Sequence, residues 1–179
     1  MKKVLLFIVA VIIVAGGIST YYTLKNKNNT TQTAQPVTKV TYKVVDACKA
    51  LTGEDAVALL NDTANRAASP STDVASPDIA VSTCSYTNPG ATKIVSLMAR
   101  SAKSPAGIDG NKVAFGANKP STAQNVTGVG DAAFWSPSLG QLNVHVSNNW
   151  YVITSGSVKP AERTADDAKT VALHVLARL

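Results

Sequence analysis

An uncharged apolar run near the N-terminus is the feature that most limits how this chain can be arranged. Residues 4–24 carry no charged side chain, whereas Lys2 and Lys3 precede them and Lys25 follows them. A helix of this length, rising about 1.5 Å per residue, crosses the roughly 30 Å hydrocarbon layer of a bilayer. Because the run is apolar on every face, we expect residues 1–24 to form a membrane anchor or signal segment rather than a core helix.

Two export pathways stay open for this segment. An uncleaved signal anchor leaves a single-pass protein in the cell membrane, whereas a cleaved signal peptide, cut near the small residues 15–17, releases a secreted one. Lysines flank both ends of the run, so the positive-inside count is nearly balanced. We favour the anchor, with the N-terminus in the cytoplasm and the C-terminal domain extracytoplasmic.

The net charge of +6 belongs to the N-terminal part of the chain. All eleven acidic residues and twelve of the seventeen basic residues lie at or after residue 43, so the remainder of the chain is nearly neutral. Binding to nucleic acid needs a basic patch on the folded domain. We therefore expect no nucleic-acid partner, and a membrane contact only through residues 4–24.

A composition change separates the apolar run from the rest of the chain. Residues 25–39 contain no acidic and no aromatic residue and are rich in Asn and Thr. Such a segment cannot bury enough apolar surface to fold. We expect a flexible linker over residues 25–42 and an extracytoplasmic domain over residues 43–179.

Cys48 and Cys84 are the two cysteines of the chain, and both lie in the expected domain. In an exported protein such a pair is typical of a disulfide, which stabilises a loop of this length by about 3.5–4 kcal/mol on the chain-entropy model. Two unrelated buried thiols are the alternative. A metal site is less favoured, because neither cysteine has CxxC spacing or a nearby histidine.

Alternating apolar and polar residues predict two groups of strands. Residues 79–87 and 92–100 flank Asn88-Pro89-Gly90 and predict a β-hairpin. Three further strands, at residues 132–135, 142–147 and 150–155, predict a meander. Strands grouped between helices favour an α+β fold, in which an antiparallel sheet of hairpin plus three-stranded meander packs against two or three helices.

Helix-capping residues mark where those helices begin. Thr52 and Asp55 resemble a capping box ahead of a helix near residues 53–61, with a further helical turn from residue 46. Pro105 can open a second helix, although several glycines weaken it. Thr164 predicts the N-cap of a C-terminal helix whose apolar stripe belongs to the core: Ala165, Ala168, Val171, Ala172, Val175, Leu176 and Leu179.

No constellation of catalytic or ligand-binding residues stands out. His145 and His174 fall on the polar faces of their elements, so we expect both to be solvated. The acidic pairs at residues 54–55 and 166–167 suit helix N-termini. Residues 128–131, Gly-Val-Gly-Asp, predict a tight turn into a strand, since a dinucleotide site requires a strand before and a helix after it. We expect no catalytic, cofactor-binding or metal site.

Several short motifs together are similar to those of a known group of proteins. Residues 46–60 (DACKALTGEDAVALL), Cys84-Ser85-Tyr86 and residues 128–135 (GVGDAAFW) resemble small exported bacterial domains, many of them actinobacterial lipoproteins of unknown function. The resemblance implies a cell-envelope location, a Cys48–Cys84 pairing and no known enzymatic activity. The chain departs from the lipoprotein members because it has no cysteine near residue 17 for lipid attachment.

We therefore expect a membrane-tethered domain of the cell envelope that binds an unknown ligand or protein and is not an enzyme. One alternative is a structural component of a membrane complex. The other is an envelope hydrolase without a recognisable motif, in which His145 or an acidic pair lines a cleft.

Overall fold

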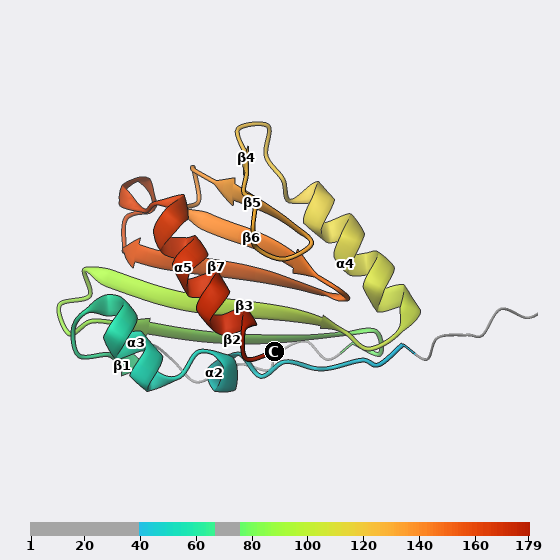
Figure 1. Ribbon diagram of the computed structural model, residues 1–179, viewed down its shortest axis with the longest axis horizontal. Helices are drawn as coiled ribbons and strands as arrows, with labels where there is room; N and C mark the ends of the chain where they lie inside the picture. Colours follow the sequence, from blue (N-terminus) through green and yellow to red (C-terminus); the bar gives the residue numbers. More distant parts are fainter. Residues whose placement is uncertain (1–39, 67–75) are drawn as a thin grey trace, which may run out of the picture. The chain divides into compact units, whose positions relative to one another are not determined.

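A seven-stranded antiparallel sheet organises the part of the chain that the computed structural model describes, residues 40–66 and 76–179 (Figure 1). The strand order is β1-β2-β3-β7-β6-β5-β4. The strands are β1 (Asn65–Arg66), β2 (Ile79–Thr87), β3 (Lys93–Ala102), β4 (Gln124–Asn125), β5 (Ala132–Ser136), β6 (Gln141–Val146) and β7 (Asn149–Ser157). The α+β class and the antiparallel sheet expected from the sequence are confirmed.

The hairpin and the meander are both present, and one long pairing joins them. In the β2–β3 turn, Asn88 Oδ1 accepts hydrogen bonds from the backbone N–H groups of Thr92 and Lys93, both at 2.9 Å. Strands β5, β6 and β7 form the meander. β3 then pairs with β7 from Lys93↔Ser157 to Arg100↔Trp150, so the two groups make one continuous sheet.

One face of the sheet, here called the covered face, is defined by Cys84, Leu97 and Ile153, which lie in register on β2, β3 and β7. Three helices pack on it: α2 (Ala47–Ala50), α3 (Gly53–Leu60) and α5 (Ala165–Leu176) (Figure 1). Four residues of the predicted α5 stripe are fully buried there, namely Ala168, Val171, Ala172 and Val175. The stripe therefore forms core, as expected, and small alanines let the helix approach the sheet closely.

The predicted caps begin the helices. Thr52 and Asp55 form a reciprocal capping box at α3, and the Thr164 hydroxyl accepts a hydrogen bond from the N–H of Asp167 at α5. Pro105 opens α4 (Pro105–Ala117), with Ser104 as N-cap. A Cβ on Gly107 would clash with the backbone oxygen of Asp78, so this glycine lets the start of α4 lie against the chain before β2.

Helix α4 packs on the opposite face of the sheet, here called the open face. Asn111 of α4 is fully buried and accepts a hydrogen bond from Arg100 Nε, while its amide donates to the carbonyls of Arg100 and Asn148. Phe115 packs against the Phe134 ring with centroids 5.0 Å apart. These contacts hold α4 over β3, β7, β6 and β5 at one end of the sheet.

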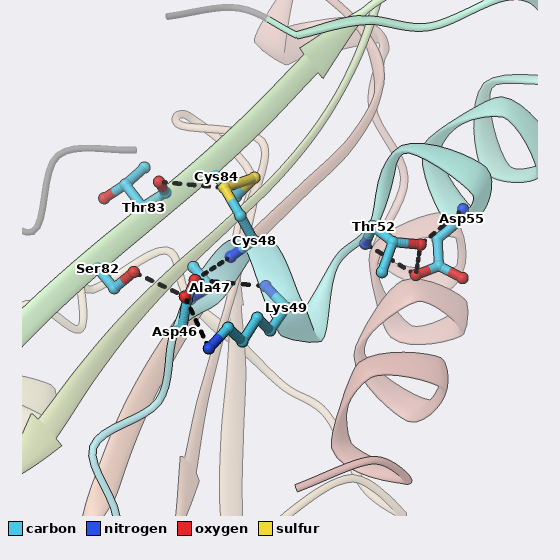
Figure 2. Close-up of a disulfide and its surroundings, with 9 residues drawn as sticks. All are labelled: Asp46, Ala47, Cys48, Lys49, Thr52, Asp55, Ser82, Thr83 and Cys84. Atoms are coloured by element: carbon cyan, nitrogen blue, oxygen red, sulfur yellow. Dashed lines mark hydrogen bonds and ion pairs between the residues drawn. A yellow bond between two sulfur atoms is a disulfide. The ribbon is translucent and has the colours of Figure 1, made fainter. Parts of the chain in front are cut away.

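The Cys48–Cys84 disulfide is present and connects α2 to the middle of β2 (Figure 2). Around it, the Ala47 N–H donates to the Ser82 hydroxyl at 2.9 Å, and Asp46 caps α2. A four-residue helix has too few internal hydrogen bonds to persist alone. The disulfide and the Ser82 contact therefore fix α2 on the sheet.

Thr41–Leu179 form one compact unit. The predicted anchor at residues 4–24 lies outside the described residues, as do most of the linker at 25–42 and most of the loop at 66–77. Within the described ranges, no helix has both the length and the apolar character needed to cross a bilayer.

Candidate functional site

A groove on the open face of the sheet encloses about 310 Å³. Its floor is a row of four residues that lie opposite one another on β2, β3, β7 and β6: Thr83, Met98, Val152 and Asn143. This volume is at the lower end of the range for small-molecule sites. The groove is therefore large enough for a small ligand or for a short segment of a polymer.

Neighbouring residues extend the floor and raise two walls. Ser96, Thr154 and Gln141 continue it on one side, and Trp150 borders it towards α4. Asn118, at the C-terminal end of α4, and Leu139, in the β5–β6 turn, contribute the walls. The side chains come from segments far apart in sequence, and the β3–β7 pairing brings them together.

The lining is uncharged but rich in hydrogen-bonding groups. Thr83, Ser96 and Thr154 contribute hydroxyls, and Asn118, Gln141 and Asn143 contribute amides. In residues 40–66 and 76–179, the hydroxyls of Thr83, Ser96 and Thr154 and the amide of Gln141 make no hydrogen bond to one another or to other protein groups. Since hydroxyls and amides both donate and accept, these groups can bind a polar ligand.

A hydrogen bond orients the amide at the floor of the groove. Trp150 Nε1 donates to Asn143 Oδ1 at 3.1 Å, and the two side chains are only 7% and 4% exposed. With Oδ1 engaged, Asn143 presents its Nδ2 as a donor. The groove thus has a preorganised donor beside an aromatic ring.

Two buried polar atoms on the open face have no partner among the described residues, Ser136 Oγ and His145 Nε2. Ser136 lies opposite the groove residue Gln141, and His145 lies opposite Trp150. Buried polar groups are nearly always hydrogen-bonded, so an unpaired one needs an explanation. Neither residue lines the groove, although each is paired across the sheet with one that does.

His145 is not solvated, contrary to the expectation from its place on the polar side of a strand. It is 9% exposed because α4 covers it, with the Phe115 ring 5.7 Å away, centroid to centroid. Burial lowers the pKa of His145, Lys112 lowers it further, and Asp131 opposes both effects. The net lowering of the pKa favours the neutral form of His145, and this residue does not line the groove.

His174 is exposed, as expected, but it also makes a specific contact. Its Nε2 lies 2.7 Å from Oδ1 of Asp55, and Arg178 donates two hydrogen bonds to the same carboxylate. Burial raises the pKa of Asp55, but hydrogen bonds from Arg178, His174 and Thr52 outweigh it and hold that pKa well below its usual range. The cluster clamps the start of α3 to the end of α5, on the covered face.

The remaining sequence candidates have structural roles. Gly128 and Gly130 adopt φ of 74° and 62° in a tight turn before β5, as expected, and Asp131 accepts a hydrogen bond from the N–H of Ser147, in the β6–β7 turn. The acidic pairs at residues 54–55 and 166–167 lie in the first turns of α3 and α5. Over the described ranges, no three His, Cys, Asp or Glu side chains come close enough to hold a metal ion.

Sequence reasoning missed the groove, although a signal for it exists. The solvent side of an ordinary strand carries charged residues, whereas β2, β6 and β7 contain none. Thr83, Asn143 and Thr154 are the neutral polar residues that alternate with core residues in these strands. The sequence alone does not show that these residues line one groove, because that depends on the register between the strands.

Comparison with protein-family models, with curated proteins and with solved structures gives no match to this chain.

Proposed function

We propose that this chain is a membrane-tethered, extracytoplasmic domain of the cell envelope that binds an uncharged polar ligand in the groove and performs no chemistry on it. The resemblance to small exported domains and the apolar run at residues 4–24 support the location. The Cys48–Cys84 disulfide agrees with an oxidising compartment.

The lining of the groove carries the proposal of binding. It offers oriented hydrogen-bonding groups beside Trp150 and Met98, a combination typical of ligand sites. None of the ten described lining residues is an Asp, Glu, His, Lys or Cys, so the hydroxyls of Thr83, Ser96 and Thr154 have no general base beside them in this lining. An envelope hydrolase would need His145 or an acidic pair in a cleft, but α4 covers His145, and the acidic pairs at residues 54–55 and 166–167 do not line the groove. Binding is thus favoured over hydrolysis.

Native mass spectrometry of the full-length protein, extracted from its own membranes, tests the proposal. The wild type is expected to carry a small-molecule adduct. Ser96→Trp and Thr83→Trp, which place a bulky ring in the groove from two different strands, are expected to lose it. Val113→Trp is the matched control, because Val113 is 71% exposed on α4 and outside the groove.

Melting curves of each variant show whether it is folded. An adduct that persists in both folded groove variants would contradict binding in the groove. A wild-type chain that carries no small molecule, or only protein partners, would contradict the proposal and favour a structural component of a membrane complex.

A further inference from the structure

The chemistry of the groove narrows the class of ligand, on the premise that the proposed binding function holds. The floor repeats its hydrogen-bonding groups across four strands, which lie about 4.8 Å apart in a sheet. Thr83 and Asn143 stand at the two ends of one row, with the apolar side chains of Met98 and Val152 between them. The ligand must therefore present polar groups at its margins and apolar surface in the middle.

Charged ligands fit this site poorly. A carboxylate, phosphate or ammonium group entering the groove would lose water without meeting an opposite charge, because every lining residue that the structure describes is uncharged. Arg100, which lies opposite Trp150 on the adjoining row, donates its Nε hydrogen to Asn111. Anionic polymers and lipid phosphates are therefore disfavoured.

Purely apolar ligands also fit poorly. They would cover the hydroxyls of Thr83, Ser96 and Thr154 and the Asn143 amide without replacing their hydrogen bonds to water. Each polar group left unpaired costs about 1–3 kcal/mol. The ligand must both donate and accept hydrogen bonds.

An extended peptide lacks its usual mode of binding here. Peptides that add to a sheet use the free backbone groups of an edge strand. The floor of this groove is instead the face of β2, β3, β7 and β6, and β3, β7 and β6 each have a partner strand on both sides. Only side chains meet the ligand, so recognition depends on its own polar and apolar pattern.

We propose that the groove binds an uncharged saccharide segment, recognised by the row Thr83–Met98–Val152–Asn143 together with Trp150, Ser96 and Thr154. A neutral sugar ring presents hydroxyls around its edge, each a donor and an acceptor, and C–H groups on its faces. The hydroxyls match the Asn143 Nδ2 donor and the threonine and serine hydroxyls. The C–H faces match Met98, Val152 and Trp150, which removes apolar surface from water.

The two tryptophans provide a local test. Trp135 is buried on the covered face, opposite Leu142, whereas Trp150 lines the groove. In full-length Trp135→Phe, held in phospholipid nanodiscs because sugar-headed detergents would compete, the emission of Trp150 reports on the groove. Triacetylchitotriose and maltotriose are the neutral probes, and a heparin oligosaccharide and an end-blocked Ser/Ala peptide are the comparisons.

A saturable change in Trp150 emission is expected with at least one neutral saccharide and with neither comparison probe. Trp150→Phe, which keeps only Trp135, is expected to show no change. Removing two hydroxyls with the pair Ser96→Ala and Thr154→Val is expected to weaken binding about tenfold. Ser85→Ala, on the same face but outside the lining, is the matched control and keeps wild-type affinity.

A response to the peptide without one to the neutral saccharides would overturn the saccharide class and leave the binding function in place. A response to heparin alone would overturn the uncharged character of the ligand as well. The saccharide class would also be overturned, with the binding function left in place, if no probe changes the Trp150 emission but the native protein carries an adduct that Ser96→Trp removes. If no probe changes the Trp150 emission and native mass spectrometry finds no adduct, both the saccharide class and the binding function would be overturned.

Discussion

At the scale of single residues, Asp55 performs more tasks than the sequence indicates. The capping box predicted from Thr52 and Asp55 is present, but the same carboxylate also accepts hydrogen bonds from Arg178 and lies against His174. Arg178 and Asp55 are 123 residues apart in sequence, so no local pattern could predict that they meet. The cap was predictable because its partners are three residues apart.

Asp55→Asn is expected to lower the free energy of unfolding at pH 7 by about 1.5–3 kcal/mol, because charge-assisted hydrogen bonds become neutral ones. The native pKa of Asp55 lies below its unfolded value of about 3.8, so the unfolded chain takes up this proton first as the pH falls. The stabilisation is therefore complete above about pH 4 and is lost as the pH falls through the native pKa.

Urea unfolding of the wild type and of Asp55→Asn, at pH 7 and near pH 3, measures this effect. The difference between the two proteins is expected to shrink at the lower pH. Asp166→Asn is the matched control, since Asp166 is an exposed acid in the first turn of α5. A difference that stays constant with pH would contradict the role given to the Asp55 charge.

At the scale of elements, the local segments were predictable and their assembly was not. Turn residues such as Asn88 and caps such as Thr164 act within a few residues, so the hairpin, the meander and α5 could be read from the sequence. The β3–β7 pairing links residues 50 to 64 positions apart, and nothing in either strand specifies its partner. The expectation that His145 is solvated was wrong for a similar reason. Helix α4 covers this residue, and no local pattern in the sequence shows where α4 packs.

Asn111 is a fully buried polar anchor of helix α4 on the sheet, and this predicts a local effect. Asn111→Ala leaves the Arg100 guanidinium and two carbonyls without that partner. Amides of Pro105–Ala117 are then expected to exchange hydrogen about 30-fold faster, equivalent to about 2 kcal/mol. Hydrogen exchange read residue by residue checks this against Val113→Ala.

The amides of β3 and β7 are expected to keep wild-type protection in Asn111→Ala, because the sheet and its covered face do not depend on α4. Uniform loss of protection over the whole sheet would mean that α4 is part of the cooperative core. Unchanged exchange in α4 would mean that Asn111 does not anchor it.

At the scale of the whole molecule, one face of the sheet provides stability and the other provides the groove. Among residues 40–66 and 76–179, the covered face holds three helices and the disulfide, whereas on the open face α4 covers one end. A thin core of Ala, Val and Leu benefits from a covalent link between α2 and β2. We therefore expect stability, but not the shape of the groove, to depend on the disulfide.

Replacing both cysteines by alanine is expected to lower the free energy of unfolding by about 3–4 kcal/mol on the chain-entropy model. The melting temperature should fall by roughly 10 °C. Calorimetry on the double variant measures the loss, and the wild type treated with a thiol reductant provides the matched comparison. A melting temperature unchanged in both would show that the Cys48–Cys84 link contributes nothing to stability.

The central claim is that the groove on the open face is where this protein binds its ligand. The most direct measurement is a crystal structure of the protein purified from its own membranes without exchange of what it carries. The account predicts density for a bound, uncharged molecule over the row Thr83–Met98–Val152–Asn143, within hydrogen-bonding distance of Asn143 Nδ2. An empty groove with a ligand or partner bound elsewhere on the domain would contradict it.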